Sequence, residues 1–433
     1  MRAFAVTMSA LLVLVVAING LAAWDGRRHD RRLQALAAGL KPGQAVIVSR
    51  EVDDRRLQRV RLAVIPRPAV VAFGSSRVMP LAGAALGLGP GQFYNAAVSA
   101  ASVEDHIAFW QLLKQGGRVP DIAIFSIDHW ALAQAQEEVR WLALADLVRA
   151  FLDGVGGGAG WGGAPIQTLT YEWARFKELF SYTVLRASVA DLERTLRGRS
   201  RRGREVLESL RRDVVAEDRV GDRRAVRADG SLIYDRAYAN QSPEQVRQEA
   251  VRFIQAGGRG LAEFRVDRER LARLELLWRD MRARGVELVV YLPPYHPAAW
   301  ALIRADPRAA AALADSAAAV AALAARIGAR FRDASDPESI PCGPEQFYDG
   351  DHVRVACLRK IVDRLLAAPR PGGDGPQATQ PAQRLRATVG STCAPSVVTR
   401  PATMSKRSSR KRRAGSRSRS AVAVSSPVPS ERT

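Results

Sequence analysis

Two short segments carry side chains whose types and spacing could perform acyl-ester chemistry. Phe73-Gly-Ser-Ser-Arg77 follows an apolar run, and a serine at a sharp strand-to-helix turn exposes its hydroxyl at the edge of a sheet. In Phe347–Val353, Asp349 and His352 are three residues apart, so one turn could present both to the same point. Asp349 would then hold one ring nitrogen of His352, and the other nitrogen would act as general base for Ser76.

Other histidines and acids leave alternatives to this assignment. Asp351 could replace Asp349 as the partner of His352, or the Asp-His pair could bind a metal. We see no second group of ligand residues at suitable spacing, so a zinc site is not expected. His129 and His296 are alternative bases, although a structural role is favoured for each, and His106 is expected at the surface. The chain has no Gly-x-Gly-x-x-Gly opening a helix and no Walker loop, so no organic cofactor is expected.

The segments around these residues alternate between short apolar runs and amphipathic stretches. Strands are predicted at 69–73, 93–97, 122–127, 287–292 and 331–333. Helices are predicted from the Ser102 cap to about 114, at 268–284, at 298–327 with an interruption at Pro307, and at 353–366. This alternation predicts an α/β domain of three layers, with a parallel sheet covered on both faces.

The carboxyl ends of such strands line a cleft, which adds further candidate site residues. Ser76 follows the first predicted strand, Asn95, Ser99 and Ala100 follow the second, and Asp128 follows the third. Ligands of open parallel sheets bind in the crevice at these strand ends.

The N-terminus predicts a membrane anchor. Residues 3–23 carry no charge and are long enough to cross the hydrocarbon layer as a helix. We favour an uncleaved anchor over a signal peptide cleaved near Gly20 and Ala22. Residues 24–65 are expected to form a basic, helical stalk. By the positive-inside rule, the first arginines of this stalk would place the following domain in the cytoplasm. The family resemblance described below implies the opposite side of the membrane.

The rest of the chain divides into a domain with an insertion and a tail. Residues 66–369 form the expected α/β domain, and residues 131–265 break its alternation and are predicted as a mostly helical insertion. Residues 370–433 lack apolar periodicity and are expected to be a disordered basic tail. About half of the net charge of +21 lies in this tail, but it lacks interleaved aromatic residues, and a nucleic-acid partner is not expected.

The order of these motifs resembles the SGNH (GDSL-like) hydrolase superfamily over residues 66–368, the insertion excepted. The resemblance is closest to membrane-anchored bacterial members that act in O-acetylation or D-alanylation of envelope polymers, and Tyr291–Pro297 is similar to their Pro-rich strand end. It implies Ser76 as nucleophile, with Asp349 and His352 as its partners. Ser75 stands at the position of the usual Asp in Gly-Asp-Ser.

The resemblance also implies a set of groups around the oxyanion. The backbone N–H of Ser76 matches the first donor, Ala100 stands where the family has Gly, and Asn95 belongs to that second block. Asp128 stands where the family has an Asn donor, and an ionised carboxylate would repel an oxyanion. Arg77 would orient an anionic group or pin the turn.

The implied function is that of a serine esterase or O-acyltransferase. Its expected partners are an envelope glycan, an acyl donor and a membrane acyltransferase, with the domain on the periplasmic side of a single span. The rival interpretation is a non-catalytic SGNH-like assembly or interaction protein, which Asp128 favours. In an exported protein Cys342 and Cys357 could pair around the Asp-x-x-His loop, leaving Cys393 in the tail.

Overall fold

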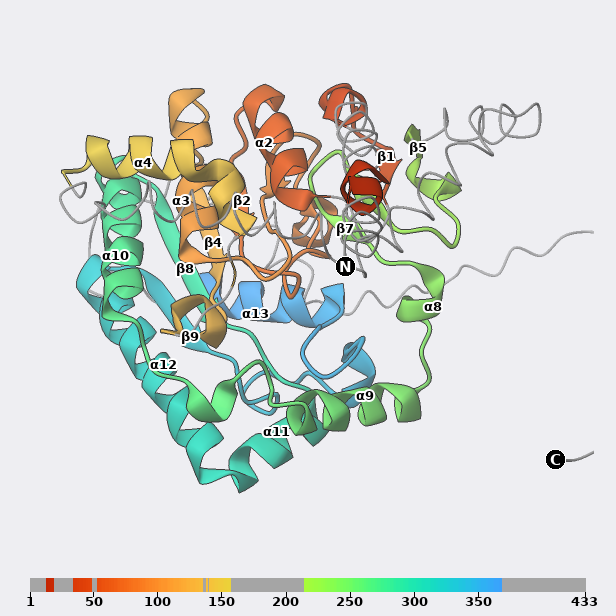
Figure 1. The fold of residues 1–433 in the computed structure, drawn as a ribbon, viewed down its shortest axis with the longest axis vertical. Coiled ribbons are helices and arrows are strands. Elements are labelled where there is room, and N and C mark those ends of the chain that lie inside the picture. Colours follow the sequence, from red (N-terminus) through yellow and green to blue (C-terminus); the bar gives the residue numbers. More distant parts are fainter. Residues whose placement is uncertain are drawn as a thin grey trace, which may run out of the picture. The chain divides into compact units, whose positions relative to one another are not determined.

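A five-stranded parallel sheet forms the centre of the protein (Figure 1). The structure is a computed structural model that describes residues 13–18, 34–48, 53–134, 138, 140–156 and 214–367. The sheet comprises β2 (Val70–Phe73), β3 (Phe93–Asn95), β4 (Ile122–Ser126), β8 (Glu287–Leu292) and β9 (Arg330–Asp333). Their spatial order is β3-β2-β4-β8-β9, and every neighbouring pair is parallel.

The strand sequences explain the central position of the sheet. Four of the five strands are buried along their whole length, as expected for apolar runs covered on both faces. Ala72 of β2 lies opposite Asn95 on one side and Ile124 on the other. In chain order, β3 is placed on one side of β2 and β4 on its other side. At such a switch point, the crevice beside the carboxyl end of the strand is the expected position of a binding site.

Helices cover both faces of this sheet. One face packs on α2 (Asp54–Val64), α3 (Val103–Gln115), α4 (Ala145–Gly154), α10 (Arg268–Ala283) and α12 (Pro307–Ile327). The other face packs on α13 (Val355–Ala367). The predicted α/β class with a parallel, two-sided sheet is therefore correct, and the predicted strands and helices agree with the observed ones to within a few residues.

Helix α3 shows how the local sequence sets these boundaries. The Ser102 hydroxyl accepts a hydrogen bond from the N–H of Asp105, and the Asp105 carboxylate accepts one from the N–H of Ser102. This capping box fixes the start of the helix at Val103, in the connection that follows β3. Ser242 and Gln245 form the same arrangement at the start of α9 (Pro243–Gln255).

A second, antiparallel sheet corrects two expectations. It has the order β5-β1-β6-β7, with β1 (Gln44–Ile47) from the predicted stalk. Its other strands, β5 (Val214–Ala216), β6 (Ala225–Arg227) and β7 (Leu232–Ile233), come from the predicted insertion. The stalk is therefore not wholly helical. Its strand β1 pairs with β5 on one side and with β6 on the other, and Ala45 and Val46 of β1 are fully buried. The described part of the insertion also contains α8 (Arg236–Ala239) and α9.

The membrane expectation falls mostly outside the described residues. Of the predicted anchor only residues 13–18 are described, and these are helical. The basic tail 370–433 and most of the insertion before residue 214 also lie outside them. Within the described part, one helix is long and apolar enough to cross a membrane, namely α12, which is weak evidence because α12 packs on α10 and β9.

Candidate active site

The turn after β2 presents Ser76 at the carboxyl edge of the sheet. Gly74 has φ of +155°, and a Cβ there would lie 2.8 Å from both Ser126 Cβ and Val78 Cγ1. Only glycine lets the turn pass this close to β4. The turn closes with a hydrogen bond from the N–H of Val78 to the carbonyl of Ser75, and Ser76 remains partly accessible.

His352 lies on a tight hairpin that follows the last strand. The N–H of Tyr348 donates to the carbonyl of His352 at 2.8 Å, and Phe347 pairs with Val353. The Asp349 carboxylate caps the turn by accepting the N–H groups of Asp351 and His352 at 3.0 and 2.8 Å.

The hairpin is held against the rest of the protein at two places. A Cβ on Gly350 would lie 2.8 Å from Ala250 Cα, so α9 packs directly on the turn. Cys342 and Cys357 form a disulfide that closes the loop carrying the hairpin, as the sequence suggested. The loop therefore has a fixed position relative to the sheet.

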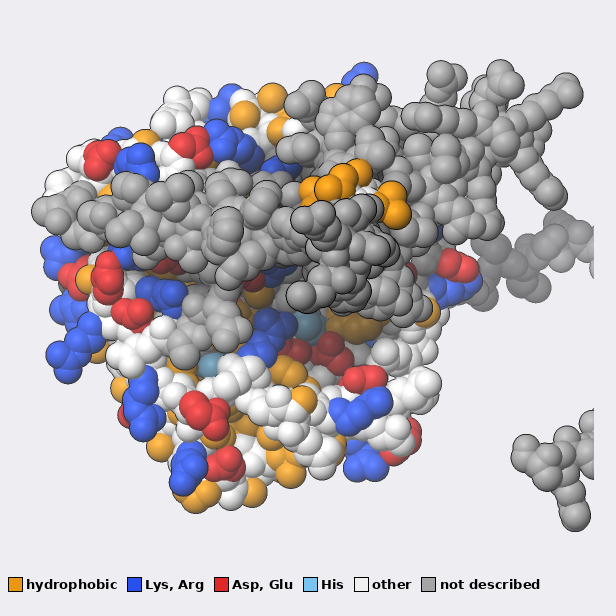
Figure 2. Space-filling view, in the orientation of Figure 1, with side chains coloured by type: hydrophobic (Ala, Val, Ile, Leu, Met, Phe, Trp, Pro, Cys, Tyr) orange, Lys and Arg blue, Asp and Glu red, His pale blue; other side chains and the backbone are white. Residues whose placement is uncertain are grey.

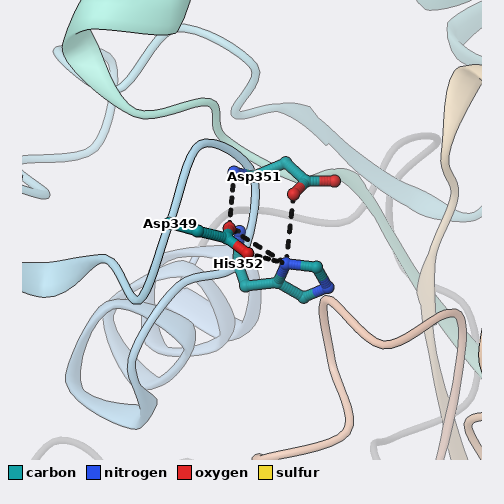
Figure 3. A group of neighbouring side chains, drawn as sticks. All are labelled: Asp349, Asp351 and His352. Carbon is teal, nitrogen blue, oxygen red and sulfur yellow. Dashed lines mark hydrogen bonds and ion pairs between the residues drawn. The ribbon is translucent and has the colours of Figure 1, made fainter. Parts of the chain in front are cut away.

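These two turns bring three predicted residues together. His352 Nε2 lies 2.7 Å from Ser76 Oγ, although the residues are 276 positions apart. On the other side of the ring, Nδ1 lies 3.0 and 2.9 Å from the two carboxylate oxygens of Asp349 (Figure 3). This is the nucleophile, base and orienting acid arrangement of serine acyl-transfer enzymes.

The second acid of the hairpin also reaches the imidazole. Asp351 Oδ1 lies 3.0 Å from His352 Nδ1, so three carboxylate oxygens surround one ring nitrogen (Figure 3). Both alternatives that the sequence left open for the acid partner are thus realised at once.

Two tyrosines of the insertion complete the site, and sequence reasoning missed them. The Tyr238 hydroxyl of α8 donates to Asp349 Oδ2 at 2.6 Å. The Tyr234 hydroxyl donates to the backbone carbonyl of Ser76 at 3.1 Å. Their rings pack on each other and on Tyr348 of the hairpin. No local pattern marks them, because each contact spans more than a hundred residues.

Arg77 joins four parts of the strand-end region. Its guanidinium donates to the carbonyls of Asp351, Pro293 and Pro294 and to the carboxylate of Asp128. Arg77 and Asp128 are both almost fully buried, and their ion pair is 3.2 Å long. This geometry fits a role of Arg77 in holding the turn in place, which was one of its two expected roles beside the orientation of an anionic group.

Asp128 is therefore paired with a cation and does not stand alone at the oxyanion position. Burial raises the pKa of its carboxyl, against the opposing effects of Arg77 and of a hydrogen bond from Ser75. Burial alone would lower the pKa of the Arg77 guanidinium, but Tyr295, Asp128 and Asp351 leave it raised.

Asn95 and Ser75 shape the turn from within. The Asn95 amide donates to the carbonyls of Val78, Met79 and Leu81, and its oxygen accepts the N–H of Ala97. Ser75 is fully buried, and its hydroxyl accepts the N–H of Arg77. Both side chains support the position of Ser76 from inside the protein.

Ala100 and Ser76 offer backbone donors. Ala100 has φ of +48°, a left-handed conformation that glycine adopts freely and alanine rarely does. Neither its N–H nor that of Ser76 donates to an acceptor in the described part of the chain. An oxyanion site requires free backbone N–H groups near the nucleophile, and the N–H of Ser76 belongs to the nucleophile itself.

The acids around His352 determine its protonation. Burial alone would lower the pKa of His352, but the carboxylates of Asp349 and Asp351 raise it to about 10. Burial would raise the pKa of Asp349, but His352, the Tyr238 hydroxyl and the backbone N–H of Asp351 hold it well below its usual range. The imidazole and the Asp349 carboxylate therefore form a charged pair, and the Asp351 carboxylate lies beside the same ring nitrogen.

Among the described histidines, His352 alone bonds to the Ser76 hydroxyl, and the others have different contacts. His129 Nδ1 is 2.9 Å from the Tyr295 hydroxyl, and burial lowers its pKa to about 3. His296 Nδ1 accepts the N–H of Ala298 as the cap of α11 (Pro297–Ala305). His106 is not at the surface as predicted, because its helix face packs on Phe73 and Phe125.

The same hairpin carries side chains of the types that bind metal ions. Among the described residues, Asp349, Asp351 and His352 form a group whose ligand atoms lie within 4.8 Å of one another. Their atoms already exchange hydrogen bonds with each other, with Ser76 and with Tyr238. This pattern is that of an acid–base cluster around one imidazole.

One face of the protein is hollowed near its middle. Figure 2 shows acidic, basic, hydrophobic and histidine side chains in this hollow. In comparisons with protein-family models and with curated proteins, nothing matches this chain. The geometry of the site is therefore the main guide to its function.

Proposed function

We propose that this protein is a serine-dependent esterase or O-acyltransferase that works through an acyl-serine intermediate. The observation that carries the proposal is the 2.7 Å contact between Ser76 Oγ and His352 Nε2, with Asp349 on the other ring nitrogen. Ser76 would attack an ester carbonyl while His352 takes its proton. His352 would return the proton to the leaving alcohol, and water or a sugar hydroxyl would then accept the acyl group.

The surroundings of Ser76 support the same reaction. The unpaired N–H groups of Ser76 and Ala100 could stabilise the negative oxygen of the tetrahedral intermediate. The left-handed Ala100 has the backbone conformation expected of a residue that replaces the glycine of SGNH hydrolases. Asp128 is engaged by Arg77, which removes the main argument for a non-catalytic protein.

We extend the proposal to the location and the substrate class. The Cys342–Cys357 disulfide favours an oxidising compartment, which agrees with a bacterial membrane anchor and a periplasmic domain. An anchored enzyme would act on esters of an envelope glycan or polymer, with a membrane acyltransferase as a source of acyl groups. The SGNH resemblance supports this substrate class.

The proposal is tested by labelling the full-length protein with a fluorophosphonate probe, which reacts with activated serines. Labelling should disappear in Ser76→Ala and in His352→Ala. The matched control is Ser339→Ala, because Ser339 is a partly buried serine whose hydroxyl donates to the Asp336 carbonyl. A folded protein that is not labelled would refute the enzyme and favour an SGNH-like assembly or interaction protein.

A further inference from the structure

Asp351 brings a second carboxylate to the imidazole of His352, although one carboxylate is enough to orient the ring. His352 has one hydrogen on Nδ1, and Asp349 accepts it at 2.9–3.0 Å while Asp351 Oδ1 lies equally close at 3.0 Å. An orienting acid is already present in Asp349, so the position of Asp351 requires a separate explanation.

The two acids differ in how their charges are satisfied. The Asp349 carboxylate accepts the Tyr238 hydroxyl and two backbone N–H groups in addition to the imidazole. Asp351 is 3% exposed, and its Oδ2 has no hydrogen-bond partner in the described part of the chain. A buried carboxylate with so few donors is stable as an anion only if a cation lies beside it.

Two cations could serve that purpose. The Arg77 guanidinium is close, but its N–H groups donate to the backbone carbonyls of Asp351, Pro293 and Pro294 and to Asp128. His352 is the group in direct contact with the Asp351 carboxylate. The second proton of the imidazole would lie on Nε2 and be donated to Ser76 Oγ.

Acids outnumber cations among the charged and titratable groups around His352. These groups are Asp349, Asp351 and Arg354 of the loop, Tyr234 and Tyr238 of the insertion, Arg77 and Asp128 of the strand ends, and His296 at the start of α11. This set holds three acids, Asp349, Asp351 and Asp128, and two guanidinium groups, and one of these, that of Arg77, is paired with Asp128. A positive imidazole reduces this excess of negative charge.

We propose that Asp351 is a positioning residue that pairs with His352 and keeps the imidazole protonated in the resting enzyme. Ser76 is then activated only after His352 loses a proton, so reactivity rises with pH through the midpoint of His352. This inference deepens the proposed function and rests on it for its catalytic meaning. The charge pair itself can be measured without any substrate.

The first measurement is the titration of His352 in the full-length protein in detergent micelles. The chain has five histidines, so ¹⁵N-labelled imidazoles give five ring systems, and His352→Gln identifies the signal. We expect a wild-type midpoint above pH 8. Asp351→Asn should lower it by about 1–3 pH units, the usual effect of removing an adjacent opposite charge. Asp349→Asn should leave it above about 6.5, because Asp351 remains.

The matched control is Glu345→Gln, which removes an exposed negative charge from the same disulfide-closed loop. Its midpoint should equal that of the wild type. A wild-type midpoint at or below pH 7, or equal midpoints in Asp351→Asn and the wild type, would overturn the inference. The wild-type and Asp349→Asn titrations decide it even if Asp351→Asn does not fold.

The second measurement connects the charge pair to reactivity. The neutral fraction of an imidazole changes about tenfold for each pH unit below its midpoint. Asp351→Asn should therefore label faster than the wild type at pH 7, by about tenfold for each unit of the shift. A shifted midpoint with no labelling in any variant would refute the proposed function alone, whereas labelling with an unshifted midpoint would refute the role of Asp351 alone.

Discussion

The hydroxyl of Tyr238 is the contact through which the insertion acts on the candidate triad, and Tyr238→Phe removes it alone. The hydroxyl donates to Asp349 Oδ2 at 2.6 Å, while the ring packs against Tyr234 and Tyr348. Phenylalanine keeps the ring and its packing. The substitution therefore measures one hydrogen bond to one carboxylate.

The expected magnitude follows from what Asp349 retains. A hydrogen bond to a charged group contributes about 1.5–3 kcal/mol to stability. Asp349 keeps three other donors, the imidazole and the N–H groups of Asp351 and His352, so its charge is not left unsatisfied. We therefore expect the lower end of the range, about 1.5 kcal/mol of lost unfolding free energy. Labelling of Ser76 at pH 7 should slow by up to about tenfold, if the same energy is lost from the transition state.

The assay is urea unfolding of the full-length protein, with the labelling rate measured on the same samples. Tyr348→Phe is the matched control, because its ring stacks on Tyr238 and its hydroxyl donates to no described residue. The control should unfold within about 0.5 kcal/mol of the wild type. If both phenylalanine variants behave like the wild type, Tyr238 does not hold Asp349 and the reasoning is refuted.

Three further substitutions test the supports of the two turns. Cys357→Ser should cost about 3 kcal/mol in urea unfolding, the loop-entropy value for a closed loop of 15 residues, and reductant should have the same effect on the wild type. Arg77→Met should cost about 3–5 kcal/mol, because Asp128 is left buried without its cation, and Arg77→Met with Asp128→Leu should recover part of this in thermal unfolding. Gly74→Ala should cost about 1–3 kcal/mol and abolish labelling, because its Cβ would overlap β4 and displace Ser76.

The central sheet could be predicted because its signals are local. Val70–Phe73 and Glu287–Leu292 are short apolar runs bounded by turn residues, and such runs become buried parallel strands when helices alternate with them. The second sheet could not be predicted in this way. Its strands have two to four residues, and β1 pairs with segments more than 160 residues away. The basic segment around β1 was expected to be a helical stalk, whereas the strand pairing depends on long-range burial.

The same difference between local and long-range signals applies to the residues of the candidate site. Ser76, Asp349 and His352 could be selected because strand ends converge and because their spacing resembles SGNH motifs. The partner of Asp128 could not, because a buried ion pair with Arg77 depends on how two neighbouring strand ends pack. His106 was expected at the surface since it lies on a capped helix, but that face of α3 packs on the sheet.

The insertion is part of the site's construction, which argues against a lid that opens as a whole. Its β7–α8 segment supplies Tyr234, which bonds to the Ser76 carbonyl, and Tyr238, which bonds to Asp349. Its helix α9 packs so closely on Gly350 that no side chain fits between them. Moving these elements away would release the nucleophile turn and the orienting acid together. Substrate is therefore expected to enter past the insertion's described elements while they stay in place, and the tyrosines should remain in contact with the triad throughout the reaction.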